Sequence, residues 1–229
     1  MPTTQISLIR EHTEKIKPPR ALWVSFELGR PLGVPGDVAF QTRVLTAVLE
    51  LLEAPSGPVL MDYPEDAPPV EGPATLVCPV SFPLPASDES DVARLSSKLM
   101  EEIALLRPWY DLAVTNSKRT TVGVSGMEPE AMGSFVAEFL DGSMPESKGD
   151  LSSATLFKLA VEDLKAYYSE AALAQTGQEE ANSNTLSAWF YRETIAGNVL
   201  SAVRNAHKDT KDKAMRLVIN ILLIPGAHR

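Results

Sequence analysis

Residues 26–40 read FELGRPLGVPGDVAF and join the end of one apolar segment to the start of an amphipathic one. The segment that leads into this stretch, residues 21–28, is rich in aliphatic and aromatic residues and predicts a β-strand. Beyond it, Asp37 is a good helix N-cap, and the apolar residues that follow recur at helical spacing: Phe40, Val44, Val48 and Leu51. Glycines and prolines fill the interval and predict a tight loop. We therefore expect a strand, a loop and a helix in succession.

The glycine-rich loop has a functional and a structural interpretation. A turn between a strand and a helix N-terminus can hold an anion with its backbone N–H groups, and Arg30 and Gly33 are then the candidates for contact with a ligand. The sequence GRPLGVPGD, however, lacks the G-x-G-x-x-G pattern and a Walker lysine, and Asp37 would repel a phosphate. The residues alone favour a rigid corner, and ligand binding stays the alternative.

Composition along the chain predicts three parts. Residues 3–9 form a further strand by pattern, so residues 1–62 are expected to make a small α/β unit. Residues 63–90 are a proline-rich connection that excludes helix and most interior strand, although TLVCPV at residues 75–80 could form a short edge strand. Residues 91–229 are predicted to be mainly helical. The fold class is therefore α/β: a small N-terminal strand-loop-helix unit joined by a Pro-rich segment to a mainly α-helical region.

The helical region has its own start and stop signals. An apolar stripe from residue 92 to residue 106 predicts a helix that ends at Pro108. Residues 119–127 could form a short strand, and Pro129 suits the first turn of the next helix. Three more helices are expected, at about residues 151–174, 185–206 and 210–224.

Composition and charge exclude several classes of protein. The 229 residues are 44% hydrophobic and 22% charged, as in an ordinary globular domain, and a net charge of −9 argues against nucleic acid or an anionic membrane as partner. The longest apolar run is far shorter than the roughly 20 residues that a membrane-spanning helix needs. The first residues lack the features of a signal peptide, so a cytoplasmic location is expected. Only one cysteine, Cys78, is present, and no cofactor or metal ion is predicted.

The second half of the chain contains candidate polar residues. In regular helices, Asp163 and Glu193 would each interrupt an apolar stripe and face the interior. Such carboxylates can serve acid–base catalysis or metal binding, but a satisfied carboxylate at the core boundary is the simpler interpretation. Arg107, Tyr110 and Arg192 would suit a small carboxylate ligand if they face a cleft. No histidine forms a triad with a nucleophile, so no catalytic residue is assigned.

The N-terminal segments MPTTQISLI and PRALWVSFELGRPLGVPGDVAFQTRVLTAVLELLE together resemble the C-terminal part of selenoprotein B, the substrate-specific subunit of glycine, sarcosine, betaine and D-proline reductases. In that family a strand with an IPT motif is followed by a second strand, a Pro-Leu-Gly turn and an amphipathic helix. The matching residues here are Pro2 to Thr4, Ala21 to Leu28, Pro31 to Gly33, and Asp37 to Glu53. The resemblance covers roughly the first quarter of the chain.

This resemblance implies a reductase-family protein that binds a small amino-acid-like substrate. The family's selenocysteine or cysteine motif lies upstream of the IPT strand, so the redox chemistry would need a partner protein or an upstream segment. Cys78 does not match that motif, and its apolar neighbours predict a small core residue and not a nucleophile. Self-association into a homo-oligomer is compatible with these features. A non-enzymatic binding or scaffold module is the alternative, and whether the chain is an enzyme stays open.

Overall fold

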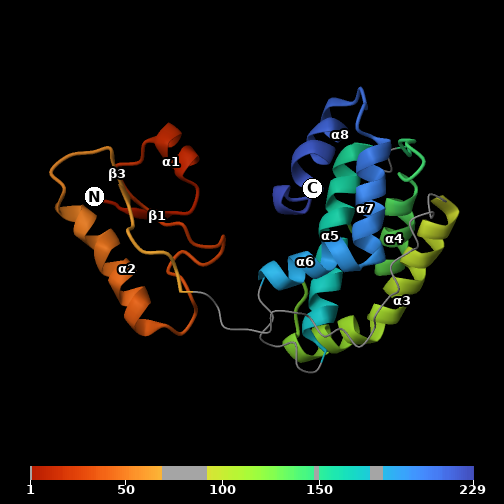
Figure 1. Ribbon diagram of the computed structural model, residues 1–229, viewed down its shortest axis with the longest axis horizontal. Helices are drawn as coiled ribbons and strands as arrows, with labels where there is room; N and C mark the ends of the chain where they lie inside the picture. The colour runs from red at the N-terminus through yellow and green to blue at the C-terminus, as the bar shows by residue number, and fades with distance from the viewer. Residues whose placement is uncertain (1, 69–91, 147–149, 176–182) are drawn as a thin grey trace. The chain divides into compact units, whose positions relative to one another are not determined.

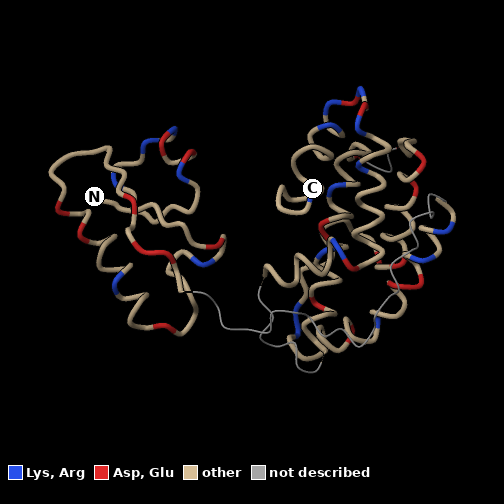
Figure 2. Tube along the Cα trace, viewed as in Figure 1, with Lys and Arg blue, Asp and Glu red and all other residues tan. Residues whose placement is uncertain are grey.

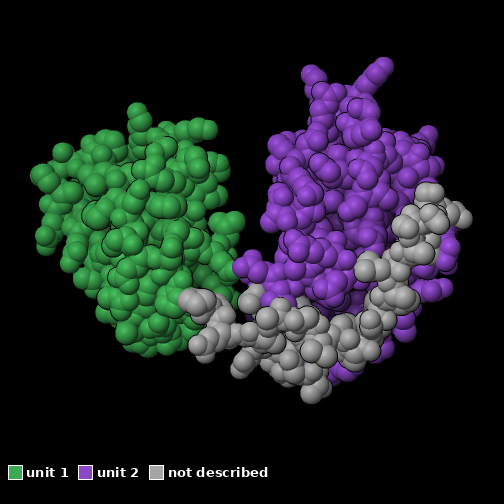
Figure 3. All heavy atoms as spheres, in the orientation of Figure 1, with its two compact units in different colours: residues 1–71 green, residues 72–229 purple. Residues whose placement is uncertain are grey.

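A computed structural model describes residues 2–68, 92–146, 150–175 and 183–229. The chain divides into two compact units, residues 1–71 and residues 72–229, which Figure 3 distinguishes by colour. Each unit has a hydrophobic core of its own. The fold class predicted from the sequence is confirmed, because a small α/β unit precedes a mainly helical part.

Three short parallel strands form the sheet of the first unit. They are β1 (Gln5–Ser7), β2 (Arg20–Trp23) and β3 (Val59–Asp62), hydrogen-bonded in the order β1-β2-β3. Helix α1 (Arg10–Ile16) joins the first two strands, and α2 (Val38–Glu50), continued by the 3-10 turn Leu51–Glu53, joins the last two (Figure 1). The strands are parallel because each helix returns the chain to the same edge of the sheet.

Each face of this sheet packs against a different helix. Successive side chains of a strand point to opposite faces. Leu22 belongs to the face that packs against the buried side of α2. Ser7 and Asp62 share the other face, where their side chains bond to Thr13 and Arg10 of α1. The sheet is therefore a thin layer between one long and one short helix.

The second unit is built around a central helix. Its helices are α3 (Val92–Ser117), α4 (Pro129–Ala137), α5 (Ser153–Leu173), α6 (Ser183–Glu193), α7 (Ile195–Ala206) and α8 (Lys213–Leu217), followed by a π-helical turn (Val218–Leu222) and a 3-10 turn (Gly226–His228). Helix α5 contacts α3, α4, α6 and α8 (Figure 1). Tyr167 and Tyr168 on α5 are both fully buried in this core.

Local sequence signals account for where these helices begin. The N-cap side chains of α2, α5, α7 and α8 each accept a hydrogen bond from a backbone N–H of the first turn: Asp37, Ser152, Thr194 and Asp212. Pro129 lies at the start of α4, as the sequence predicts. The cap at Asp37 is likewise confirmed.

Four expectations for the helical unit are wrong. Helix α3 does not end at Pro108 but continues to Ser117. The proline removes only one backbone bond, and Trp109 and Tyr110 just beyond it still pack against the core. Residues 119–127 form a loop and no strand. The helix expected at residues 185–206 is broken at Thr194, whose side chain caps a new helix. The last helix is short and ends in a π-helical turn.

Two elements of the first unit were not predicted. Helix α1 lies where the sequence suggests only a polar link between strands, and β3 lies at residues 59–62. The strand proposed at residues 75–80, with Cys78, falls outside the described residues. Within the described part of the chain, no helix combines the length and apolar character needed to cross a bilayer.

Candidate functional site

A small groove lies between α1 and the edge strand β3 of the first unit. Its volume is about 220 Å³. Residues from the end of α1 and the start of β3 line it: Thr13, Glu14, Lys17, Pro18, Pro58, Val59 and Leu60. The prolines and aliphatic residues give the groove an apolar wall, and the charged groups come from α1 alone.

The two charged residues of the groove have opposite signs. Glu14 and Lys17 are three positions apart, a spacing that brings side chains to the same side of a helix end. Lys17 ends α1 in a left-handed conformation with φ 49°, and its N–H bonds to the carbonyl of Thr13. Within the described residues its ammonium group has no hydrogen bond or ion pair. Figure 2 shows that this helix carries both basic and acidic residues.

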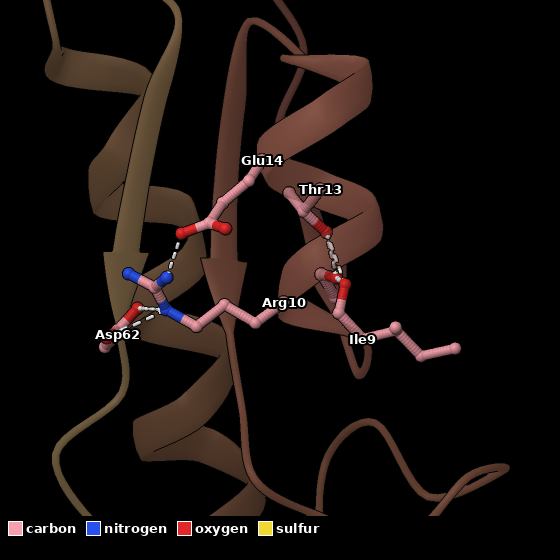
Figure 4. Close-up of polar contacts among 6 residues, drawn as sticks. Ile9, Arg10, Thr13, Glu14 and Asp62 are labelled. Carbon is pink, nitrogen blue, oxygen red and sulfur yellow. Dashed lines mark hydrogen bonds and ion pairs between the residues drawn. The ribbon is translucent and has the colours of Figure 1, made fainter.

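Arg10 connects α1 and β3, the two elements that form the groove. Its Nε donates to both carboxylate oxygens of Asp62, at 3.1 and 3.2 Å, and Nη1 donates to Glu14 (Figure 4). The hydrogen bond to Asp62, with the charges of both carboxylates, raises the pKa of Arg10, so the guanidinium stays charged. Because Asp62 is the last residue of β3, this clamp lies at the carboxyl edge of the parallel sheet, whereas the groove is lined by residues at the start of that strand.

A buried pair of hydroxyl groups fixes α1 on the sheet. The side chains of Ser7 and Thr13 are hydrogen-bonded, and Thr13 Oγ1 also donates to the carbonyl of Ile9 at 3.0 Å (Figure 4). Thr13 is almost fully buried although the helix around it is polar. The charged face of α1 is therefore held in a defined position.

The glycine-rich loop is a structural corner in this fold. Gly33 has φ 87°, and a Cβ there would lie 2.6 Å from the ring of Phe40, a buried core residue. Asp37 Oδ1 accepts the N–H of Phe40 at 2.9 Å, so the carboxylate occupies the N-terminus of α2. Arg30 forms an ion pair with Glu27 at 3.5 Å. The loop thus fits the structural interpretation better than the functional one.

Two candidates on α3 are already engaged. Arg107 forms ion pairs with Asp111 at 2.9 Å and with Glu130 at 3.0 Å, which together raise its pKa and occupy Nε and Nη1 of the guanidinium. Tyr110 lies against the ring of Tyr167, and its hydroxyl contacts that of Thr120 at 3.1 Å. Both residues belong to the second unit, and neither lines the groove described above.

The candidates on α6, Arg192 and Glu193, do not form a site with the two candidates on α3. Arg192 reaches the carbonyl of Ala227 at 3.5 Å. The interior position expected for Glu193 is wrong, since the residue is exposed. The break at Thr194 rotates the following helix out of the predicted phase, and Glu193 therefore leaves the apolar stripe.

Glu102 on α3 is a buried carboxylate that the sequence did not predict. It is fully buried and accepts hydrogen bonds from Ile195 N at 2.9 Å, Ala196 N at 3.0 Å and Tyr168 Oη at 2.6 Å. Burial raises the pKa of Glu102, although these three donors act against the shift. The carboxylate of Glu102 lies at the start of α7. Glu102 therefore caps α7 although it belongs to α3.

Asp163 is buried as predicted, and it holds the loop before α4. Its carboxylate accepts hydrogen bonds from Gly123 N, Val124 N and Ser125 N at 2.8 to 3.1 Å and from Ser125 Oγ at 2.6 Å. Burial alone would raise its pKa, but these bonds lower the pKa below the usual value. The simpler interpretation, a satisfied structural carboxylate, accounts for both buried acids.

The groove residues Glu14 and Lys17, and Arg10 beside them, were also missed. Two signals were available in the sequence. The oppositely charged residues Arg10 and Glu14 are four positions apart, which favours a helix, and Lys17 followed by two prolines marks a helix end. Among the residues that the structure describes, no group of histidine, cysteine and acidic side chains is placed to hold a metal ion. Comparison with protein-family models, curated proteins and solved structures gave no match.

Proposed function

We propose that the groove between α1 and β3 binds a small zwitterionic molecule of the amino-acid type, as the resemblance to selenoprotein B implies. The observation that carries this proposal is one carboxylate, Glu14, and one ammonium group, Lys17, on the wall of the same small apolar groove, the latter without a partner among the residues that the structure describes. An amino acid or betaine presents the complementary pair of charges. Its carboxylate would bind Lys17 and its cationic nitrogen Glu14.

The neighbouring groups support this assignment of roles. Arg10 donates to Glu14 and so holds that carboxylate in place, while the remaining lone pairs of a carboxylate can accept from a ligand. The volume of about 220 Å³ lies below the roughly 300 to 1,000 Å³ of sites for drug-sized ligands, so a molecule of the size of glycine to proline fits better. The aliphatic wall would contact methyl or methylene groups of the ligand.

Binding is only part of the proposed activity. Reductive cleavage in this family requires a selenolate or thiolate that attacks and a second group that releases the intermediate. In our proposal this chain presents the substrate, and a redox partner protein or an upstream segment supplies those groups. The protein would then act as the substrate-binding part of a reductase.

Calorimetric titration of the whole chain with glycine, sarcosine, betaine and D-proline tests this proposal. We expect at least one of them to bind, and Lys17→Gln and Glu14→Gln each to weaken binding by roughly tenfold or more, the equivalent of one charged hydrogen bond. Lys15→Gln is the matched control, because Lys15 lies on the same helix but does not line the groove. Glycinamide, which lacks the carboxylate, should lose the dependence on Lys17.

The opposite results would reject the assignment. If none of the four zwitterions binds, or if Lys15→Gln weakens binding as much as Lys17→Gln, the groove is not the site. The alternative of a non-enzymatic binding or scaffold module would then be the better description of the protein.

A further inference from the structure

The helical unit has a larger depression of about 660 Å³ at the C-terminal ends of α3 and α5. It is lined by residues from both helices and from the loop that follows α3: Ala113, Asn116, Ser117, Arg119, Thr120, Thr121, Glu170, Leu173 and Ala174. The volume is within the range of ordinary small-molecule sites. None of the functions considered above uses this depression.

The loop that carries Arg119 is held firmly on α5. Glu170 accepts hydrogen bonds from Thr120 Oγ1 at 2.8 Å and from both the N–H and the hydroxyl of Thr121 at 2.7 Å. Two helical turns earlier on α5, Asp163 binds the next part of the same loop. The wall of the depression is therefore formed before any ligand arrives.

The depression has one acidic and one basic side chain on its wall, Glu170 and Arg119, and only the acidic one is hydrogen-bonded to other described residues. The carboxylate of Glu170 is neutralised in part by three hydrogen-bond donors. The guanidinium of Arg119 has no hydrogen bond or ion pair with any other residue that the structure describes, and the side chain is exposed at the edge of the depression. A planar cation with five donors is thus available to a ligand.

Some of the carbonyl groups at these helix ends are already hydrogen-bonded. Carbonyl groups at the end of a helix repel anions when they are free. Here the carbonyls of Ala113 and Val114 accept from Ser117 Oγ and Lys118 N, both at 2.8 Å. At the end of α5, the carbonyl of Glu170 accepts from Ala174 N at 3.2 Å. These C-terminal carbonyls are engaged within the chain.

We infer that this depression binds a small monocarboxylate with an apolar body, which Arg119 holds by its carboxylate. Guanidinium and carboxylate match in a planar, two-bond geometry, and the Asn116 side chain can add a donor. Leu173 and Ala113 provide apolar contact for the rest of the molecule. A single negative charge is preferred because Glu170 would repel the second charge of a phosphate.

Titration of the isotope-labelled chain with sodium benzoate, followed by amide NMR shifts, tests the inference. Benzoate should shift residues around the depression, whereas benzamide, the neutral isostere, should bind at least tenfold more weakly. Arg119→Gln should remove the difference between the two, and Lys118→Gln, a change of the neighbouring cation that does not line the site, should preserve it. Unchanged melting temperatures of both variants will show that folding is unaffected, because both side chains are exposed.

Three results would overturn the inference. They are equal affinity for benzoate and benzamide, equal losses in the two variants, and tighter binding of inorganic phosphate than of benzoate through Arg119. The test does not depend on the zwitterion groove, since that groove belongs to the first unit and none of these variants changes it.

Discussion

Gly33 shows how one residue fixes the corner between β2 and α2. It has φ 87°, and an added Cβ would lie 2.6 Å from the Phe40 ring, which is held between Phe26 and Tyr63. Gly29 has a similar φ of 90° but nothing within 4 Å of such a Cβ, so it is a matched control. We expect Gly33→Ala to lower the free energy of unfolding by about 2 to 3 kcal/mol and Gly29→Ala by about 1 kcal/mol. Equal losses in urea unfolding would contradict the packing argument.

Asp163 makes the stability of the helical unit sensitive to acid. Its pKa is lowered in the folded protein by bonds from the loop at residues 123–125, so its contribution is present above the unfolded pKa of about 3.9 and is lost as the pH falls through the folded pKa. Asp163→Asn should cost roughly 2 to 3 kcal/mol at pH 7 and should remove this part of the acid dependence. Urea unfolding at pH 7 and at pH values below 4 measures both effects. A variant as acid-sensitive as the parent would refute this role.

Glu102 should respond to pH in the opposite direction. Burial raises its folded pKa, so a proton on this carboxyl stabilises the folded state, and that contribution is lost as the pH rises through the folded pKa. Glu102→Gln keeps the shape but presents an amide N–H to one of the backbone donors of α7, and we expect a loss of about 1 to 3 kcal/mol at pH 7. The loss should grow toward pH 4, because only the parent protein gains stability when this carboxyl takes up a proton. A loss independent of pH would contradict a raised pKa of Glu102 in the folded protein.

The two buried carboxylates also show the limit of sequence reasoning at this scale. Asp163 could be predicted because it lies inside one uninterrupted helix with a clear apolar stripe. Glu193 could not be placed, since its orientation depends on whether the helix continues past Thr194. Glu102 is adjacent to another glutamate, and only the tertiary contact with α7 identifies it as buried.

At the scale of elements, α3 shows that a proline does not always end a helix. Pro108 lies inside the helix, and its ring lacks the N–H that the preceding turn would bind. Proline in a helix interior is about 3 kcal/mol less favourable than alanine. We expect Pro108→Ala to raise the free energy of unfolding by roughly 1 to 3 kcal/mol, with Leu105→Ala, at an exposed position of the same helix, close to neutral. A destabilised Pro108→Ala protein would mean that the proline has a packing role.

The two elements of the first unit that the sequence did not predict are short. Helix α1 has seven residues and β3 has four, so neither is long enough to repeat an apolar pattern. By contrast, the apolar spacing over α2 and the cap at Asp37 are local signals, and both were predicted. The groove depends on α1 and β3, and it could not be predicted for that reason.

At the scale of the whole molecule, the separate cores predict separate unfolding. Gly33 belongs to the first unit and Asp163 to the second, and each unit has its own set of buried residues. Calorimetry should show two transitions, with Gly33→Ala lowering the temperature of one and Asp163→Asn that of the other. If each variant lowers both transitions together, the units unfold as one.

The proposed role as a substrate-binding part predicts no turnover by the chain alone. Assays with a dithiol donor and glycine, sarcosine, betaine or D-proline should give no reduced product. Cys78→Ser should leave that result and the binding of zwitterions unchanged. Turnover that disappears in the Cys78→Ser variant would identify the cysteine as a nucleophile and overturn our assignment of the redox group to another segment.

The cap that Glu102 provides for α7 joins residues 93 and 94 positions apart in the chain. During synthesis from the N-terminus, this carboxylate is complete long before its backbone donors exist. Until Ile195 and Ala196 have been added, the charge has no counterpart in the interior and is retained by water, because its burial would be unfavourable. The part of α3 around Glu102 is therefore expected to complete its packing only after α7 has been made, so that residues 195–229 determine when this part of the core forms.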